Sequence, residues 1–311
     1  MKQEVFLAIV VIAIGQISAT WQQGLTTEKI DEFFVDRCVK FGTLPRTKEI
    51  FDVKKFTKSQ CQTLWNQFAE NIKGRDPCKV TKASYGDWLK AVDKLYLDQK
   101  WGYFKNKATF WSQTKDLADG MSAIPGSNYL TLASMVTGYV LDGNGVAWCP
   151  TDSSNSKDGW EYGTGHCKCN VVKHFWDAVS EDMAEKARGK VYVLFTTQSS
   201  KEKPAYRADS VFGETELPKL EAIKKITEIS VMLLKPFNDE RKVQAECWDS
   251  IQPSTPDKSL ADMKRTLDSL PYIKDIKKEC IGYSKSDAFK DELCKLNPKF
   301  DGCKKEGPVG K

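Results

Sequence analysis

Ten cysteines constrain the fold of this chain more than any other feature, because each bridge between them fixes which segments lie together. They stand at positions 38, 61, 78, 149, 167, 169, 247, 280, 294 and 303. An even number of cysteines in a chain that enters the oxidising secretory pathway predicts five disulfides. Spacing alone leaves their pairing open.

The two ends of the chain indicate where it is found. "MKQEVFLAIVVIAIGQISAT" joins a polar start to an apolar run from Val5 to Ile14, followed by small residues. We interpret residues 1–19 as a secretory signal peptide, since the apolar run is too short to span a bilayer; an uncleaved anchor is the alternative. Residues 306–311 form a polar tail without an anchor signal. We therefore expect a protein that is secreted or lies in a vesicle lumen, with no membrane anchor.

The group "GHCKC" allows a second interpretation of the cysteines. His166, Cys167 and Cys169 could bind zinc together with Cys149. However, C-x-C is not the usual spacing of zinc ligands, and exported thiols tend to oxidise. We expect disulfides here and no metal.

Charge and composition narrow the classes of partner. The 311 residues are 41% hydrophobic and 29% charged, as is typical of a globular protein. The net charge of +5 is not gathered into one run, so the sequence gives no case for nucleic acid. A small anionic substrate is compatible with this charge.

Apolar residues recur at helical spacing in the first part of the chain. Thr57 and Gln60 form a capping-box pattern ahead of an apolar stripe from Cys61 to Ile72. "SYGDWLKAVDKLYL" repeats this pattern behind Ser84 as the expected cap, and "HFWDAVSEDMAEKA" predicts a third helix. We expect the aromatic residues of these stripes to lie in a core.

The period changes near residue 190. "KVYVLFTT" and "ITEISVMLLK" are typical of buried strands, and Pro256 opens a predicted helix, "DKSLADMKRTLDSL". Strand, helix and strand predict a parallel sheet that the segment around "ECIGYS" completes. The predicted fold class is α/β with an α+β-like organisation, stapled by disulfides: residues 20–189 form a mainly helical domain, and residues 190–305 form a domain with a short parallel sheet.

Common catalytic motifs are absent from the sequence. It has no G-x-S-x-G elbow, no P-loop and no G-x-G-x-x-G after a strand. Two histidines, His166 and His174, leave little basis for histidine acid–base chemistry. In "SVFGETELPKL", Glu214 and Glu216 lie two residues apart, and such pairs are most often a solvated face. This stretch alone does not decide between that role and chemistry.

Four segments, taken together and in order, resemble the ADP-ribosyl cyclase family. They are "NKATFWSQTKDLA" (106–118), "YLTLASMVTGYVLDGNGVAWC" (129–149), "FWDAVSEDMAE" (175–185) and "SVFGETELPKL" (210–220). The resemblance extends from about Cys38 to Cys303. It implies a helical domain beside a smaller domain with a parallel sheet, in agreement with the change of period.

The resemblance also implies an activity. Members cleave the bond between nicotinamide and ribose in NAD and give cyclic ADP-ribose and ADP-ribose, and base exchange, including on NADP, is a further outcome. NAD is then the substrate, and we expect no cofactor. A homodimer is compatible with the resemblance.

A disulfide pairing follows from the resemblance as well. It implies the pairs Cys38–Cys61, Cys78–Cys169, Cys149–Cys167, Cys247–Cys280 and Cys294–Cys303. No thiol is left over.

Site residues follow in the same way. Glu216 matches the family's catalytic glutamate, while Glu214 falls at a variable position where we expect it to be solvated. Trp111 and Trp176 match two active-site tryptophans. The further residues that the resemblance places at the substrate are Ser112, Gln113, Asp142, Ser180, Val211 and Phe212.

This sequence departs from the family at positions that influence the products. Ala133 stands where members carry an acid that contacts the nicotinamide amide and influences the balance of cyclisation and hydrolysis. Val211 stands where a strongly cyclising molluscan member has an aromatic residue, and Gln113 where another member has an arginine. We expect a mixed enzyme that forms both products.

Two other functions stay open. A catalytically silent secreted protein of the same fold that binds nucleotides is the alternative, with Ala133 as its best support. Retention of Glu216, Trp111 and Trp176 counts against it. A purely structural disulfide module has no positive sequence feature.

Overall fold

A computed structural model describes most of the chain. The described residues are 24–51, 53–97, 104–112, 114–143, 145–152, 158–196, 205–234, 259–282 and 294. The predicted signal peptide, the polar tail, Pro256 and Gln113 lie outside them.

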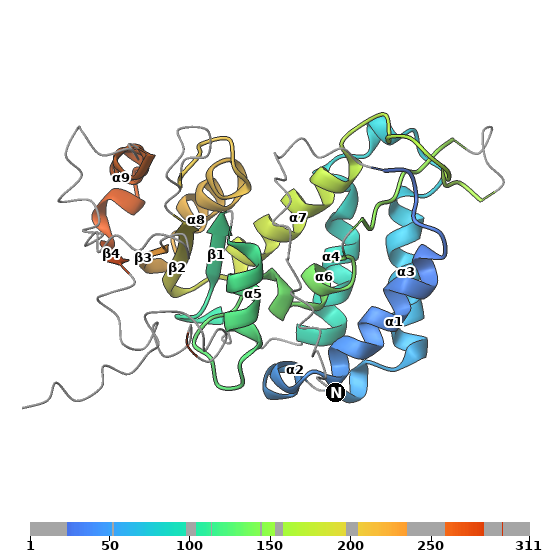
Figure 1. The fold of residues 1–311 in the computed structure, drawn as a ribbon, viewed down its shortest axis with the longest axis horizontal. Coiled ribbons are helices and arrows are strands. Elements are labelled where there is room, and N and C mark those ends of the chain that lie inside the picture. The colour runs from blue at the N-terminus through green and yellow to red at the C-terminus, as the bar shows by residue number, and fades with distance from the viewer. Residues whose placement is uncertain are drawn as a thin grey trace, which may run out of the picture.

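Helices build the N-terminal part of the described chain, where α1, α3 and α4 pack on one another (Figure 1). They are α1 (Ile30–Thr43), α2 (Pro45–Ile50), α3 (Lys58–Ile72), α4 (Gly86–Val92), α5 (Lys115–Ala123), α6 (Val136–Tyr139) and α7 (Val171–Lys186). Short helical turns lie between them: η1 (Val53–Lys55), η2 (Pro77–Lys79), η3 (Lys82–Tyr85), η4 (Asp93–Leu97) and η6 (Leu132–Ser134). No helix among the described residues is both long and apolar enough to cross a bilayer.

The start of α3 is the one that the sequence predicts. Thr57 adopts an extended backbone and its hydroxyl accepts from the backbone N–H of Gln60, while the Gln60 side chain accepts from the backbone N–H of Thr57. Two amide groups that the helix itself leaves unpaired are thus satisfied. The expected stripe from Cys61 to Ile72 is buried.

The expected cap at Ser84 is wrong. Ser84 lies inside η3, where its hydroxyl accepts from the backbone N–H of Thr81, the residue that precedes this turn. The α-helix α4 then begins at Gly86 without a side-chain cap. A tight turn ahead of α4 takes the capping group, and hydrophobic spacing does not reveal such a turn.

A four-stranded parallel sheet lies beside the helices. It contains β1 (Thr109–Ser112), β2 (Gly189–Thr196), β3 (Ile226–Leu234) and β4 (Lys277–Gly282), in that spatial order. The parallel sheet predicted from the last three strands is confirmed. The edge strand β1 comes from the segment predicted to be helical, and its four residues are too few to show a strand period.

The last described elements connect and cover these strands. They are η7 (Phe212–Glu216) and α8 (Leu217–Ile223) between β2 and β3, and α9 (Ser259–Ser269) and η8 (Ile273–Asp275) before β4. Met263 and Leu267 of the predicted α9 stripe are fully buried.

The two faces of the sheet have different partners. Alternate side chains such as Val193 and Val231 join a core with α8, α9 and the end of α7, which supplies Met183. Leu194 and Met232 point to the opposite face, toward α5. This alternation is the pleat of a sheet that is buried on both sides.

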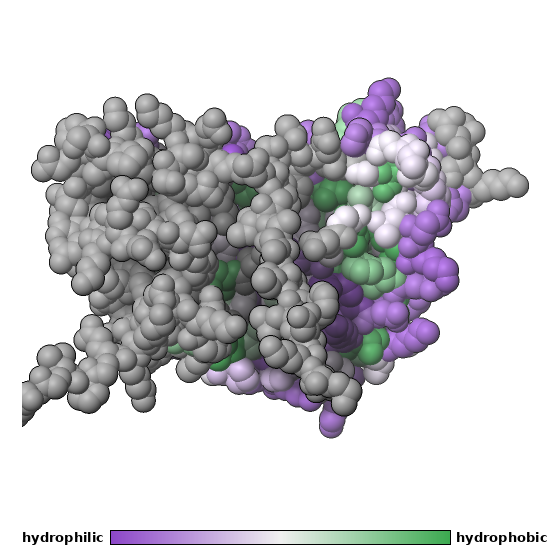
Figure 2. Space-filling model, in the orientation of Figure 1, coloured by the Kyte–Doolittle hydropathy of each residue, from purple (hydrophilic) through white to green (hydrophobic). Residues whose placement is uncertain are grey.

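The helical part has its own core, rich in aromatic rings. Phe68 and Phe175 lie 5.9 Å apart between ring centroids, and Trp88 and Trp148 pack on both. The aromatic residues predicted to lie in this core are buried, with Trp176 as the exception, since it is half-buried. On the face drawn in Figure 2, hydrophilic residues follow the outer edge of this helical part.

Three disulfides link described residues. They are Cys38–Cys61, Cys78–Cys169 and Cys149–Cys167, which are pairs that the resemblance implies. Cys280 and Cys294 are also disulfide-bonded, and the partners expected for them, Cys247 and Cys303, lie outside the described residues. Because the sulfurs of Cys149, Cys167 and Cys169 are in bridges, the zinc interpretation is wrong.

Candidate active site

Glu216 is the last residue of η7, a π-helical turn that leads directly into α8. Such turns are rare and are frequent at functional sites. Gly213 permits this turn, because a Cβ at that position would lie 2.3 Å from the backbone oxygen of Ala208. Pro218 follows in the first turn of α8, where proline is tolerated. The local sequence thus fixes the backbone that carries Glu216.

The carboxyl group of Glu216 is buried but only partly hydrogen-bonded. The residue is 5% exposed, and Ser180 donates a hydrogen bond to the carboxylate. Its Oε2 has no hydrogen-bond partner among the described residues. A buried polar atom without a partner is costly, and such atoms are frequent where a ligand binds.

Burial changes the ionisation of this group. The pKa of Glu216 is raised to about 8, mainly because burial removes the hydration of the charged form. The hydrogen bond from Ser180 lowers this pKa, and the negative charge of Asp177 raises it. In the free protein at neutral pH, the proton therefore stays on Glu216 in most molecules. Perturbed carboxyl groups of this kind are frequent in active sites.

One face of α7 lies against this turn. Trp176 and Ser180 are four residues apart, so both side chains lie on the same side of the helix, and α7 packs on η7 and α8. Ser180 is 2% exposed, whereas Trp176 keeps part of its ring accessible and contacts Phe175 with ring centroids 5.1 Å apart. A half-buried tryptophan on the helix face that carries Ser180 offers a flat apolar surface to a ligand.

Two charged residues on the same helix face were not predicted. Lys173 donates to Oδ2 of Asp177 at 2.8 Å and lies 3.7 Å from Oε2 of Glu214. Glu214 is half exposed, in agreement with its expected solvation. Lys173 lies three residues before Trp176 and Asp177 three residues before Ser180, a spacing that puts all four on one helix face but does not distinguish that face from an ordinary exposed one.

The carboxyl end of β1 brings the other expected residues close. β1 packs against η7, and the rings of Phe110 and Phe212 lie 6.1 Å apart between centroids. Ser112 shares the face of Phe110 and is buried, while Trp111 is half-buried and packs toward α5 on the opposite face. Ligands of parallel sheets bind outside the carboxyl ends of the strands, which is where these residues lie.

Three further expected residues lie around this centre. Ala133 is half-buried in η6, which packs against α7. Asp142 follows α6 and forms an ion pair with Lys115, the first residue of α5. Val211, half-buried, precedes η7. The structure thus brings Ser180 into contact with Glu216, and places Ala133 and Asp142 on neighbouring elements without a described contact to it.

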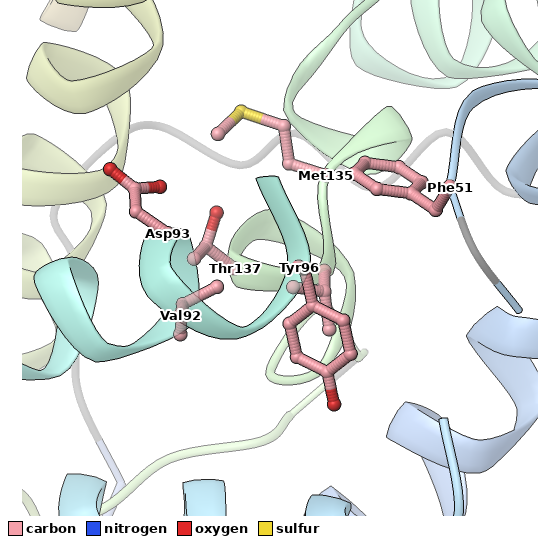
Figure 3. A pocket seen from close by; sticks show the side chains of 7 residues that line it. Phe51, Val92, Asp93, Tyr96, Met135 and Thr137 are labelled. Carbon is pink, nitrogen blue, oxygen red and sulfur yellow. The ribbon is translucent and has the colours of Figure 1, made fainter. Parts of the chain in front are cut away.

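A small pocket to which Glu216 does not contribute is drawn in Figure 3. It is lined by Phe51, Val92, Asp93, Tyr96, Met135, Val136 and Thr137. Its volume of about 210 Å³, adjoining solvent included, is below the usual range of ligand sites. It contains none of the expected site residues, and we interpret it as a gap in packing.

A cluster of one buried lysine and two half-buried carboxyl groups lies beside this pocket and links η4 to α7. Lys186, whose side chain is 1% exposed, donates to Oδ1 of Asp93 at 2.6 Å and also pairs with Asp182. Burial raises the pKa of both carboxyl groups despite the nearby ammonium. The cluster holds the end of α7 in place.

No group of three or more metal-binding side chains occurs in the described part of the chain.

Comparisons with known proteins match most of the chain. A family model described as ADP-ribosyl cyclase matches residues 27–299. The "ADP-ribosyl cyclase/cyclic ADP-ribose hydrolase" of Aplysia californica is 26% identical over 98% of this chain and 97% of its own. The "ADP-ribosyl cyclase/cyclic ADP-ribose hydrolase 1" of Oryctolagus cuniculus is 27% identical over 67% of this chain and 65% of its own. The crystal structure of Aplysia cyclase complexed with substrate NGD and product cGDPR matches with a TM-score of 0.66 and 26% identity, and covers 90% of this chain and 98% of that one.

Proposed function

The chain belongs to the ADP-ribosyl cyclase family and is an enzyme that processes NAD, and we propose that Glu216 is the group through which it cleaves the bond between nicotinamide and ribose. The observation that carries this proposal is the buried carboxyl group of Glu216, with one oxygen bonded to Ser180 and the other without a partner among the described residues.

A carboxylate is the group that this reaction needs. The leaving nicotinamide is already a cationic pyridinium, so it can depart without a general acid. Its departure leaves positive charge on the ribose, as in glycoside hydrolysis. A negative group fixed in a site with little water stabilises this charge in the transition state. Oε2 of Glu216, which has no partner in the described part of the chain, can accept a hydrogen bond from a ribose hydroxyl and so hold the sugar at this place.

The ionisation of Glu216 is coupled to the charge of the substrate. The free enzyme holds a proton on this group at neutral pH, because its pKa is about 8. A cationic pyridinium beside it favours the carboxylate, since opposite charges in a site of low dielectric attract strongly. We expect binding of NAD to release this proton.

The tryptophans and Ser180 have supporting roles in this proposal. Trp176 presents a half-exposed ring to stack on nicotinamide while the ring is charged, and Trp111 supplies a second flat surface near the end of β1. Ser180 keeps the Glu216 side chain in one orientation through its hydrogen bond. Ser112 and Phe212, both buried, complete the wall between β1 and η7.

The fate of the ribosyl intermediate depends on which nucleophile is near it. Water gives ADP-ribose, and the adenine of the same molecule gives cyclic ADP-ribose if it lies within attacking distance. Ala133 cannot hold a water or bond the nicotinamide amide, so hydrolysis loses part of its advantage. Both products are therefore expected, with base exchange as a third outcome.

Location and assembly are part of the same proposal. The disulfides and the apolar N-terminal run support a secreted or vesicular protein. Nucleotide substrates, NAD first and NADP second, are its expected partners, and a homodimer is compatible with the family.

Substitution of Glu216 by glutamine tests the proposal. The change keeps the shape and removes the charge, so we expect nicotinamide release from NAD to fall by about a hundredfold to a thousandfold. Chromatography of the products measures it. Glu214→Gln, two residues away and half exposed, is the matched control and is expected to keep near-normal turnover. Near-normal turnover of Glu216→Gln would overturn the assignment, and a wild-type protein that binds NAD without releasing nicotinamide would favour the silent nucleotide-binding alternative.

A further inference from the structure

A second carboxylate lies beside Glu216 and has no part in the mechanism above. Asp177 is 7% exposed, although aspartate is rarely buried without a full set of partners. Its Oδ2 accepts from Lys173, but its Oδ1 has no hydrogen-bond partner among the described residues. The site therefore contains two buried carboxyl groups, each with one oxygen that no described residue bonds.

Helix geometry places Asp177 next to Glu216. Asp177 and Ser180 are three residues apart on α7, which puts them on one face of the helix. Ser180 bonds directly to Glu216, and α7 packs on η7. The negative charge of Asp177 acts on Glu216 across this contact and raises its pKa.

Lys173 balances the charge of Asp177. It lies one turn earlier on α7, and its Nζ is 2.8 Å from Asp177 and 3.7 Å from Glu214. The side chain of Lys173 is 30% exposed, so part of its charge is screened by water. The pair of Lys173 and Asp177 is thus close to neutral as a unit, and its negative member is the one whose charge acts on Glu216.

Other charged groups on the packed elements have partners of their own. Lys82 of η3 and Lys219 of α8 both pair with Glu181 of α7. β1, which also packs on η7, has no titratable side chain. The remaining titratable residues on these elements are Tyr85, Asp87, Lys90, Tyr139, His174, Asp182, Glu185, Lys186 and Glu221. Asp177 is the charged side chain that acts most directly on Glu216.

We propose that Asp177 is a positioning residue that acts through Glu216, and that with Lys173 it makes the site favour a cationic nicotinamide ring over a neutral one. The inference rests on the proposed function. Two neighbouring carboxyl groups ionise together only at a cost, and a bound pyridinium removes that cost because it supplies the missing positive charge. A substrate that lacks this charge gains nothing from the pair.

The pH profile of kcat/KM for NAD tests this role, because it reports the ionisation of the free enzyme. Asp177→Asn keeps the shape and leaves Lys173 as an unbalanced cation, so Glu216 loses its proton more easily. We expect the rise of kcat/KM with pH to occur about 0.5 to 1 pH unit lower than in the wild type. The plateau at high pH should fall several-fold, since one negative charge is missing, and the two profiles then cross.

Two further variants separate this effect from damage to the fold. Lys173→Met combined with Asp177→Asn removes both charges at once, and we expect the profile to return toward the wild-type position. Glu181→Gln, on the same helix with other partners, is the matched control and should leave the profile in place. Thermal unfolding of each variant shows whether it is folded. If Asp177→Asn does not fold, Asp177→Ser gives the same measurement.

The outcomes are distinct. A profile that Asp177→Asn does not move, or one that the double variant does not bring back, overturns the inference while the proposed function stands. A wild-type protein without nicotinamide release, or a Glu216→Gln variant with normal release, overturns the proposed function itself.

Discussion

Replacing Glu216 by glutamine should stabilise the folded protein at alkaline pH, although the same change removes the proposed activity. The wild-type carboxyl group is buried, and ionising it in the folded state is costly because the charge loses its hydration. Glutamine has nearly the same shape and does not ionise. A site residue whose removal stabilises the protein is typical of the conflict between stability and function.

The pKa values give the size and the sign of the effect. The pKa of Glu216 is about 8 in the folded state and about 4.5 in the unfolded chain. Between these values the folded state holds one more proton, so the free energy of unfolding falls as pH rises, by about 1.4 kcal/mol per pH unit. The stability that comes from the proton on Glu216 is fully present below pH 4.5 and fully lost above pH 8. The free energy of unfolding changes by about 5 kcal/mol in total between these limits, an amount comparable to the whole stability of a small domain.

Denaturant unfolding between pH 5 and pH 9 measures this difference. The tryptophan fluorescence of the disulfide-intact protein follows the transition, and the midpoint and slope give the free energy of unfolding. We expect the free energy of Glu216→Gln minus that of the wild type to increase by several kcal/mol from pH 5 to pH 8 and then to level off. Glu214→Gln, at a half-exposed position, should give a difference that hardly changes with pH.

A flat difference curve for Glu216→Gln would refute the reasoning. It would mean that Glu216 has the same pKa in the folded protein and in the unfolded chain, because its carboxylate keeps its hydration in spite of burial. A difference that decreases with pH would mean that folding lowers the pKa of Glu216, and this would require a cation beside the carboxylate in the free enzyme.

Three other changes test separate parts of the site and fold. Trp176→Ala removes the half-exposed ring proposed to stack on nicotinamide, and initial rates should show KM for NAD raised by about tenfold with little change in unfolding temperature. Ala133→Glu restores an acid near the nicotinamide amide, and chromatography should show the ratio of cyclic to linear product shifted toward hydrolysis by up to about tenfold, which corresponds to about 1.4 kcal/mol between the two barriers. Lys186→Met leaves two half-buried carboxyl groups without their cation, and denaturant unfolding at pH 7 should show a loss of about 3 to 5 kcal/mol that shrinks at acid pH, where the carboxyl groups are protonated.

The site could be predicted in part. The ordered motifs proposed Glu216 as the catalytic residue, and the structure buries its side chain in contact with Ser180, another residue proposed for the site. Lys173 and Asp177 were not predicted, because their types and spacing are those of an ordinary exposed helix face. Only the packing of α7 on η7 turns that face toward a buried carboxyl group.

Local patterns determined the regular elements. The capping box at Thr57, the buried stripes of α3 and α7, and the three long parallel strands all follow from hydrophobic period and from hydrogen bonds between residues near in sequence. These interactions form within a few residues, so the sequence alone is enough to predict them.

Tertiary structure decided the features that depend on contacts between segments distant in the sequence. β1 is a strand because β2 supplies its hydrogen-bond partners, and its four residues have no period of their own. Trp176 belongs to a stripe that looks like core, yet its place at the edge of that core leaves the ring half exposed. The proton on Glu216 depends on the loss of water and on the charge of Asp177, which lies on α7, a helix that packs against η7 from an earlier part of the chain. Burial and charge are properties of the assembled molecule, and the chemistry of this site depends on them.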